Sequence, residues 1–236
     1  MSNPTETAAP AIASENKVVT FKKVKSSSRV RAMIAGANEV MRAMGYTEHG
    51  LRHADVVSGI TRYIMEGLGM PPRQVELATI AAYLHDIGNS INRTDHPISG
   101  AGLAFQILSD MGMPTEEITP ILGAIGNHEE TGGQPVSNMS ASLILADKSD
   151  VHFSRVQNPV LETFDIHDRV NYAVQKSRVE MDSHDKTILL ALEIDTNFAT
   201  VMEYFEIFLN RMVMCRRSAS MMGYRFALSV NGTSLE

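Results

Sequence analysis

The sequence predicts a mainly α protein, with a helical bundle over residues 26–165 and a small α+β unit of short antiparallel strands and a long helix over residues 166–236. Apolar residues recur at helical spacing through the first segment. Runs rich in β-branched residues appear only after about residue 165. The chain has 236 residues, of which 44% are hydrophobic and 20% charged, so it can bury a sizeable core.

Residues 1–25 are predicted to form a disordered or extended arm before the bundle. Residues 1–16 are rich in Ala, Pro, Thr, Ser and Asn, as disordered tails are. Residues 17–25 read KVVTFKKVK, which is β-rich and basic and predicts a short edge strand or an arm. The first helix is expected over residues 26–45, because this segment opens on serine N-caps and ends at Gly45.

Five helical segments are expected between residues 51 and 155. Apolar stripes there alternate with glycine and proline boundaries, and Pro72 suits the first turn of its helix. Glu116 and Glu117 suit the first turn of the helix expected over residues 114–130, because the N-terminal end of a helix carries partial positive charge. In order, the segments are 54–69, 72–88, 97–112, 114–130 and 137–154.

The remaining segments predict the α+β unit. Two β-rich runs flank a turn-like Ser-His-Asp cluster and predict a hairpin. A long amphipathic helix and a further strand follow, and Asn231-Gly232 is a turn signal at the end of that strand. The hairpin strands, the helix and the last strand are expected over residues 177–182, 186–195, 196–223 and 224–230.

The composition excludes several functional classes. The net charge of −6 provides no basic field for nucleic acid or an acidic membrane surface. The single cysteine, Cys215, excludes an internal disulfide and a cysteine-rich zinc site, and suits a reducing compartment. The N-terminal stretch lacks the pattern of a secretory signal, and no window approaches the roughly 18 apolar residues of a membrane span. We therefore expect a cytoplasmic protein without nucleic-acid or membrane partners.

Six histidine and aspartate side chains stand where apolar helical segments meet polar residues. A single histidine at a helix end is usually a cap or a surface residue, so the ordered set carries the signal. Helical bundles build metal sites from such side chains facing their own core. The candidate ligands are His53, His85, Asp86, His96, His128 and Asp147.

Four histidines and two aspartates suffice for two divalent ions with Asp86 as a bridge. A donor set of nitrogen and oxygen without thiolate favours Fe or Mn, with Mg or Zn as alternatives. Two ions a few ångströms apart activate a hydroxide and clamp a phosphoryl group, so the set indicates hydrolysis of a phosphoester.

Other candidates lie close to the ligands in sequence. Asp86 as the bridge and Glu129 as a hydrogen-bond acceptor or proton shuttle are the catalytic candidates. Lys148, Arg93 and Arg155 are candidates for binding the substrate phosphate. A solvated helix lysine is the alternative for Lys148, and the two arginines would more commonly lie at the surface.

The order of these residues resembles the HD-domain superfamily of metal-dependent phosphohydrolases. YLHDIGN, at residues 83–89, is similar to the signature segment of that family, and ILADKSDVHFSRV, at 144–156, to the segment with its last aspartate. The resemblance covers about residues 45–155. It implies that His53, His85, Asp86 and Asp147 hold one metal and that Asp86, His96 and His128 hold the second.

The two additional histidines, His96 and His128, are similar to the branch related to HD-GYP cyclic-dinucleotide phosphodiesterases. Three features differ from that branch: Asn89 replaces a lysine, Asn127 precedes His128 where the branch often has a second histidine, and the Gly-Tyr-Pro triplet is absent. We therefore expect a small phosphorylated substrate such as a nucleotide, but do not carry over the cyclic dinucleotide.

Two alternatives remain open at this point. Proteins that resemble inositol oxygenase use a similar set of four histidines and two aspartates to hold two irons, so the site could be a di-iron oxygenase. The departures from HD-GYP also leave open a catalytically weak regulator that binds metal or nucleotide. Whichever of the three functions holds, the long C-terminal helix could pair with a second copy and form a homodimer.

Overall fold

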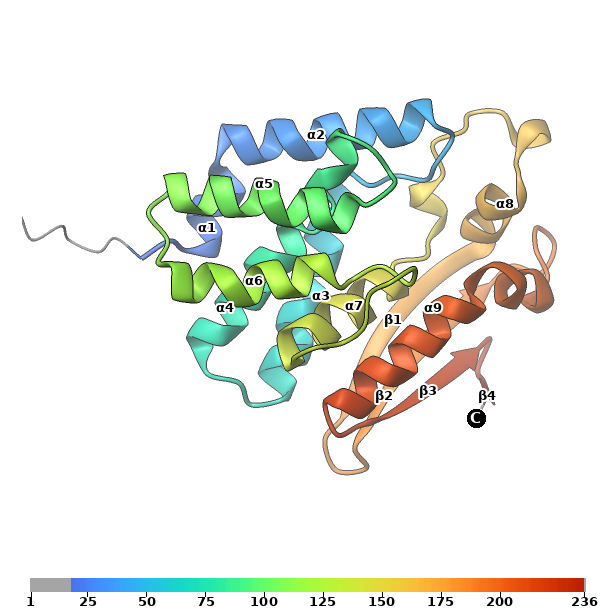
Figure 1. The fold of residues 1–236 in the computed structure, drawn as a ribbon. Coiled ribbons are helices and arrows are strands. Elements are labelled where there is room, and N and C mark those ends of the chain that lie inside the picture. Colours follow the sequence, from blue (N-terminus) through green and yellow to red (C-terminus); the bar gives the residue numbers. More distant parts are fainter. Residues whose placement is uncertain (1–17, 236) are drawn as a thin grey trace, which may run out of the picture.

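The computed structural model describes residues 18–235, so the expected disordered tail over residues 1–16 lies outside the described residues. Figure 1 shows a group of helices beside a smaller unit of four strands, α8 and α9. The predicted mainly α fold with a small α+β unit is confirmed. The first group contains α1 (Phe21–Ser26), α2 (Ser28–Ala43), α3 (Leu51–Gly67), α4 (Pro72–Leu84), η1 (Ile87–Ser90), α5 (His96–Asp110), α6 (Thr115–Gly126) and α7 (Asn138–Ser149). The second contains η2 (Phe153–Arg155), η3 (Leu161–Thr163), α8 (Ile166–Ala173), β1 (Val174–Asp182), β2 (Thr187–Ile194), α9 (Val201–Met221), β3 (Arg225–Val230) and β4 (Thr233–Leu235).

The expectation of an extended arm or edge strand over residues 17–25 is wrong from Phe21 onward, where α1 begins. The Thr20 side chain caps this helix by accepting a hydrogen bond from a backbone N–H three residues later. The Phe21 N–H donates to Glu76 of α4 over 3.0 Å, and the Phe21 ring meets Tyr83 edge-on. These contacts with α4 favour a helix that local β-propensity does not indicate.

Helices α4 and α7 lie at the centre of the protein. Every residue of α4 from 77 to 84 is buried. On α7, Leu143 packs into the core of the bundle, whereas Leu145 packs into the core of the C-terminal unit. Helix α7 therefore contacts both parts, and it ends at Ser149, before the end of the segment expected from the sequence.

The strands form one sheet in the order β1-β2-β3-β4. Strands β1 and β2 are the expected antiparallel hairpin, and β3 and β4 are antiparallel across Asn231-Gly232, where both residues have positive φ as a tight hairpin turn requires. Strands β2 and β3 instead pair in parallel, because α9 connects them and brings the chain back to the same end of the sheet. This pair differs from the expected antiparallel arrangement.

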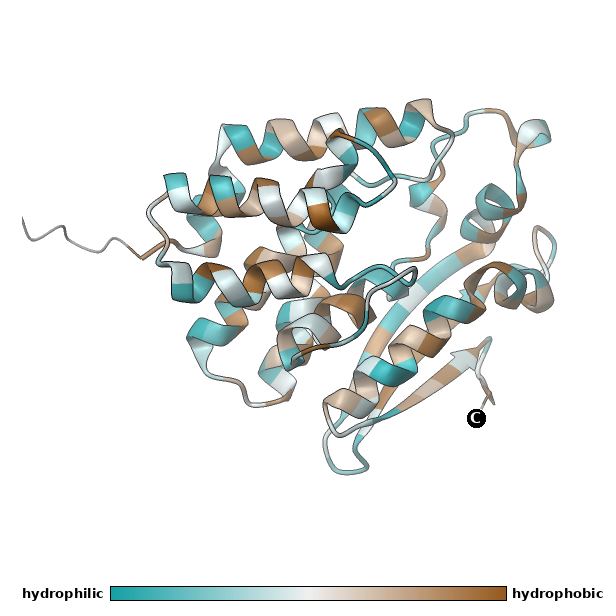
Figure 2. Ribbon diagram, viewed as in Figure 1, coloured by the Kyte–Doolittle hydropathy of each residue, from teal (hydrophilic) through white to brown (hydrophobic). Residues whose placement is uncertain are grey.

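Helix α9 covers the apolar face of the sheet and packs on α7. It begins with a capping box, in which Thr200 and Glu203 each accept a backbone N–H of the other. Its buried residues, among them Tyr204, Phe208 and Cys215, join the buried face of β2. Figure 2 shows hydrophobic and hydrophilic segments alternating along this helix, as expected for a helix buried on one side.

Helix α8 is not among the elements expected from the sequence. Asp165 caps it by accepting the N–H of Asp168 over 2.8 Å, and its buried Val170 and Ala173 join the C-terminal core. None of the helices in the described part of the chain has both the length and the apolar character that crossing a membrane demands.

Candidate metal centre

The six candidate ligands meet where the ends of five helices converge. His53 lies in the first turn of α3, and His96 is the first residue of α5. His85 and Asp86 follow the last residue of α4 directly, His128 follows α6, and Asp147 lies in the last turn of α7. The structure brings all six together in overlapping groups that could hold metal ions, and we refer to them as the ligand cluster.

Three of the four imidazoles are oriented in the same way. His85, His96 and His128 each place Nδ1 within 3.0 Å of the carbonyl oxygen three residues earlier, so Nδ1–H donates to that oxygen. This hydrogen bond fixes the proton on Nδ1 and leaves the Nε2 lone pair directed at the cluster. Each ring is therefore oriented as a metal ligand by its own segment.

His53 is oriented by a carboxylate instead. Its Nδ1 lies 2.6 Å from Oδ2 of Asp150, a residue directly after α7. Arg52 pairs with the same carboxylate over 2.6 Å, and Arg155 donates to the Asp150 carbonyl over 2.7 Å. Burial opposes the charge on Asp150, but His53 and the two arginines hold its pKa below the usual range. Asp150 is therefore a charged acceptor that holds the His53 ring.

Asp86 lies between the two pairs of histidines. Its Oδ2 is 3.5 Å from Nε2 of His53 and 3.2 Å from Nε2 of His85. Its Oδ1 is 3.4 Å from Nε2 of His96 and 3.7 Å from Nε2 of His128. One carboxylate thus presents one oxygen to each pair, as a bridging ligand does.

Asp147 joins the first pair of histidines. Its Oδ1 is 3.2 Å from Nε2 of His53 and 3.6 Å from Nε2 of His85, while its Oδ2 pairs with Lys148 over 2.9 Å. Burial would raise the pKa of Asp147, but Lys148 and the two histidines hold it well below the usual range. A negatively charged ligand therefore completes this side of the cluster.

The donor atoms fit divalent metal ions. Nε2 of His53 and His85 lie 3.3 Å apart, and Nε2 of His96 and His128 lie 3.0 Å apart, so two lone pairs face each other in both pairs. Oδ2 of Asp86 is buried and accepts no hydrogen bond from the described residues. A cation between each pair would satisfy these atoms, and nitrogen and oxygen donors of this kind suit Fe, Mn, Mg or Zn.

The electrostatics of the cluster also favour positive charge at its centre. Burial lowers the pKa of His85, but the Asp86 and Asp147 carboxylates outweigh burial and raise it to about 10. The facing histidines hold the pKa of Asp86 well below its usual range, although burial acts in the other direction. These carboxylates thus remain charged in a buried place, where an unpaired charge is costly.

Asn89 holds the Asp86 carboxylate, and Gly88 allows α5 to approach closely. Asn89 is fully buried, and its Nδ2 donates to Oδ1 of Asp86 over 2.9 Å. A Cβ on Gly88 would stand 2.0 Å from the His96 carbonyl oxygen and 2.6 Å from the Gly100 nitrogen. Only glycine therefore allows α5 to approach closely enough to bring His96 to the cluster.

Each candidate for binding phosphate is held by carboxylate or carbonyl groups. Lys148 is 3% exposed and lies 3.0 Å from Glu130, so the alternative prediction of a solvated helix lysine is wrong. Arg155 is 2% exposed and bonded to backbone carbonyls, so its expected surface position is wrong as well. Arg93 is partly buried and pairs with Glu129 over 3.1 Å. Burial opposes the charge on Lys148, but Asp147 and the neighbouring glutamates outweigh it and raise its pKa.

A small chamber lies over the cluster. It offers about 10 Å³, which is about the room that one water molecule needs. Its walls combine cluster residues with charged neighbours from the loops and from α9. They are Asp86, His128, Asp147, His49, Arg93, Glu129, Lys148, Arg155 and Arg211.

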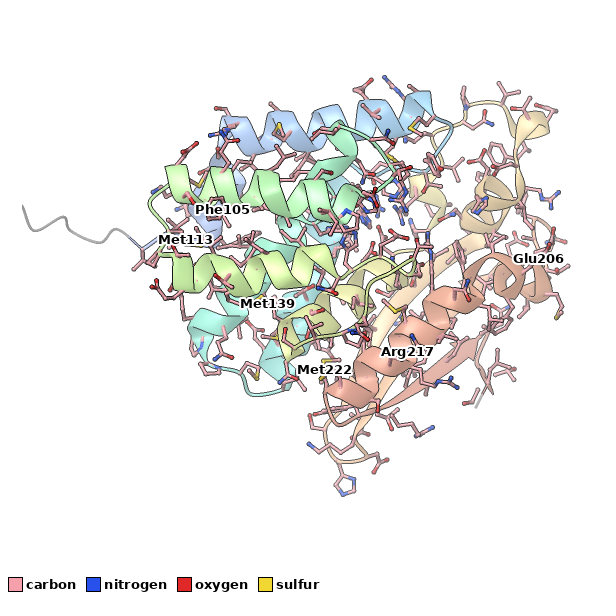
Figure 3. The ribbon with its side chains drawn as sticks, viewed as in Figure 1. Phe105, Met113, Met139, Glu206, Arg217 and Met222 are labelled. Carbon is pink, nitrogen blue, oxygen red and sulfur yellow. The ribbon has the colours of Figure 1, made fainter. Side chains whose placement is uncertain are left out.

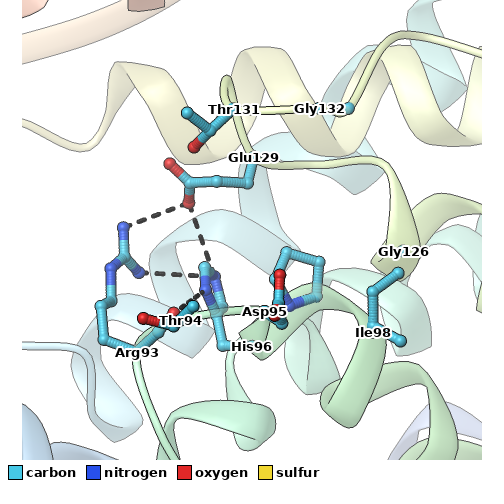
Figure 4. A pocket seen from close by; sticks show the side chains of 11 residues that line it. Arg93, Thr94, Asp95, His96, Ile98, Gly126, Glu129, Thr131 and Gly132 are labelled. Carbon is cyan, nitrogen blue, oxygen red and sulfur yellow. Dashed lines mark hydrogen bonds and ion pairs between the residues drawn. The ribbon is translucent and has the colours of Figure 1, made fainter.

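A larger outer pocket of about 550 Å³ opens beside this chamber, within the size range of small-ligand sites. Arg93 and Glu129 line both spaces, and Figure 4 shows their ion pair next to His96. Nη1 of Arg93 lies 3.4 Å and Oε2 of Glu129 3.5 Å from Nε2 of His96. The ion pair thus stands between the outer pocket and the ligand cluster.

Sequence reasoning missed four residues of this region. Asp150, three residues after Asp147, could have been found as a second carboxylate in the same segment. Glu130 directly follows Glu129, but its sequence position does not indicate the lysine that it contacts. His49 lies in the loop before α3, but it is buried and lines the chamber. Arg211 carries no local signal, because only the packing of α9 brings it to the site.

The family of this region follows from a comparison with known proteins. The model of the HD domain family matches residues 50–155, which contain every member of the ligand cluster. Residues 50–155 are an HD domain. HD domains bind divalent metals and are generally metal-dependent hydrolases. The relationship to the HD-GYP branch stays a prediction.

One relative extends the similarity beyond the HD domain. "Uncharacterized protein MJ1020" of Methanocaldococcus jannaschii is 26% identical over 186 residues, which cover 70% of this chain and 71% of that protein. Because this alignment is longer than the matched HD segment, the similarity also includes flanking parts of the chain.

Proposed function

We propose that the protein is a metal-dependent phosphohydrolase with two divalent ions, acting on a small phosphoester such as a nucleotide. The observation that carries this proposal is the placement of Asp86, whose two carboxylate oxygens each face a different pair of histidine Nε2 atoms. A single ion would use only one of these pairs. When bound, two such ions activate water and offset the negative charge of phosphoryl oxygens.

The residues of the chain supply the remaining functions. Arg93, Lys148 and Arg155 surround the chamber with fixed positive charge, which suits a phosphate group. Glu129 is kept ionised, since Lys148 and Arg93 outweigh the effect of burial and lower its pKa. Its carboxylate, close to His96, can accept a proton from water or hold that water by a hydrogen bond. The outer pocket has room for the part of the substrate that is not phosphate.

The proposal is tested by metal analysis together with a substrate screen. The purified full chain, reconstituted with Mn or Fe, should bind about two ions. It should hydrolyse at least one member of a panel of phosphomonoesters, cyclic nucleotides and cyclic dinucleotides. Asp86→Ala should lose both metal and activity, because this carboxylate faces both pairs of histidines. The wild type should hydrolyse the substrate at the same rate in air and under argon.

Three outcomes would contradict the proposal. A chain that binds no divalent ion with all six ligands intact would remove its basis. Turnover that requires both iron and oxygen would identify an oxygenase instead. Tight binding of a nucleotide without hydrolysis, whichever metal is bound, would favour a regulator.

A further inference from the structure

Helix α9 of the C-terminal unit contributes one cation to the chamber over the ligand cluster. Arg211 lines this chamber together with Lys148 and Asp147. The guanidinium stacks on the Phe208 ring one turn earlier on α9, with its Cζ 4.4 Å from the ring centroid. Arg211 is thus fixed by its own helix in a direction that reaches the metal centre.

A carboxylate already links Arg211 to Lys148. Oε1 of Glu130 lies 3.2 Å from Nε of Arg211, and its Oε2 lies 3.0 Å from Nζ of Lys148. The two cations are therefore spaced so that one anionic group with two oxygens contacts both. A phosphate group presents oxygens at a similar spacing and accepts hydrogen bonds from arginine and lysine in the same way.

The chamber beside Lys148 and Arg211 has no room for a substrate phosphate while Glu130 bridges these two cations. The chamber holds about one water molecule, which is too little for a phosphate group. Glu130 belongs to the loop between α6 and α7, where Gly132 has a φ of 109°. Movement of this side chain would open space between Lys148 and Arg211, directly beside Asp147.

We propose that Arg211 and Lys148 together bind a phosphate group of the substrate, which takes the place of the Glu130 carboxylate. This inference rests on the proposed function, and it makes Arg211 a substrate-binding residue supplied from outside the HD domain. The C-terminal unit is then a part of the active site. Glu130 acts as an internal competitor that occupies the anion position until the substrate arrives.

Binding of orthophosphate to the manganese-loaded full chain, measured by calorimetry, tests the inference. Arg211→Gln should weaken binding about tenfold, since it removes a charge-assisted hydrogen bond. Arg211→Lys keeps the charge and should bind more tightly than Arg211→Gln. Glu130→Gln should bind orthophosphate about tenfold more tightly than the wild type, because the competing charge is removed. The matched control is Arg217→Gln on the exposed face of α9 (Figure 3), which should stay within about twofold of the wild type.

Manganese content and circular dichroism are measured for each variant, so that loss of the metal centre or of the fold is seen separately. Equal affinities for Arg211→Gln and Arg217→Gln, or weaker binding by Glu130→Gln, would overturn the inference. If the wild type binds orthophosphate and hydrolyses an ester while Arg211→Gln behaves like the control, the inference alone fails. If the wild type binds manganese but no orthophosphate, the inference and the proposed phosphohydrolase fail together.

Discussion

At the scale of single residues, we expect Asp86 to determine how many ions the ligand cluster can hold. Because its two oxygens serve both pairs of histidines, Asp86→Ala should reduce the metal content to well below one ion per chain. His96→Ala removes a donor from one pair only and should retain about one ion. Elemental analysis of the purified variants measures this difference.

Equal metal content in the two variants would contradict a bridging role for Asp86. His167→Ala is the control, since this histidine is exposed on α8 and lies outside the ligand cluster and the other groups of described residues that could hold a metal. It should retain the metal content of the wild type.

Asp150 gives a second prediction at this scale. Asp150→Asn keeps the size of the side chain but removes the charge that holds Nδ1 of His53, so metal affinity should fall about 10- to 100-fold. Competition with a fluorescent chelator measures the affinity. Asp110→Asn alters an exposed ion pair with Arg29 and should leave the affinity unchanged. An unchanged affinity in Asp150→Asn would show that His53 does not depend on this carboxylate.

At the scale of elements, the approach of α5 to η1 depends on Gly88. Gly88→Ala places a methyl group against the His96 carbonyl and the Gly100 nitrogen, so α5 must shift. We expect a loss of about 1–3 kcal/mol in the free energy of unfolding, as for other overpacked sites, together with a loss of about one metal ion. Thermal denaturation and metal analysis measure the two effects.

A matched glycine in α5 serves as the control for this substitution. A Cβ on Gly102 meets nothing within 4 Å, so Gly102→Ala should stabilise the protein by about 0.5–1 kcal/mol through helix propensity. Equal effects of the two substitutions would show that the close contact at Gly88 is unimportant.

The packing of α9 predicts an unreactive thiol. Cys215 is fully buried, and burial raises its pKa to about 12. At pH 8 the group is therefore protonated as well as covered, and a disulfide reagent should modify it only after denaturant unfolds the chain. The absorbance of the thiolate that the reagent releases measures the reaction. Fast modification of the native protein would mean that α9 leaves the core readily.

The sequence predicted elements whose structure is determined locally and failed where contacts between elements decide. The main helices of the bundle follow from their apolar stripes and their caps. Helix α1 depends on contacts with Glu76 and Tyr83 of α4, so its β-rich composition was misleading. The parallel pairing of β2 and β3 depends on the return path through α9, which no local pattern records.

At the scale of the whole molecule, the ligand cluster draws on five consecutive helices, from α3 to α7. Ions that bind only the folded chain should therefore stabilise it, by about 2.7 kcal/mol for each ion present at 100 times its dissociation constant. For a chain of this size we expect chelation to lower Tm by roughly 5–10 °C per ion. Calorimetry before and after chelator treatment, with metal added back as the control, measures the shift. An unchanged Tm would mean that the cluster holds no ion.

The distinction between local sequence signals and contacts between elements also applies to the candidate site. The convergence of the six candidate ligands could be predicted because each stands at a helix end, where the sequence pattern changes visibly. Asp150 could have been noticed as a second carboxylate in the segment of Asp147, but its contact with His53 follows only from the structure. Arg211 belongs to a different unit, and its place at the chamber follows from the packing of α9 against α7.

The bonds from three imidazoles to backbone carbonyls three residues earlier have a consequence for the choice of ion. Because each ring is held by its own segment, the donor atoms are in place before an ion arrives and cannot adjust much afterwards. A rigid set of donors discriminates between ions by their size and preferred geometry, whereas a flexible set accommodates many. The selectivity of this centre would then be set by the ends of its helices rather than by the supply of metal.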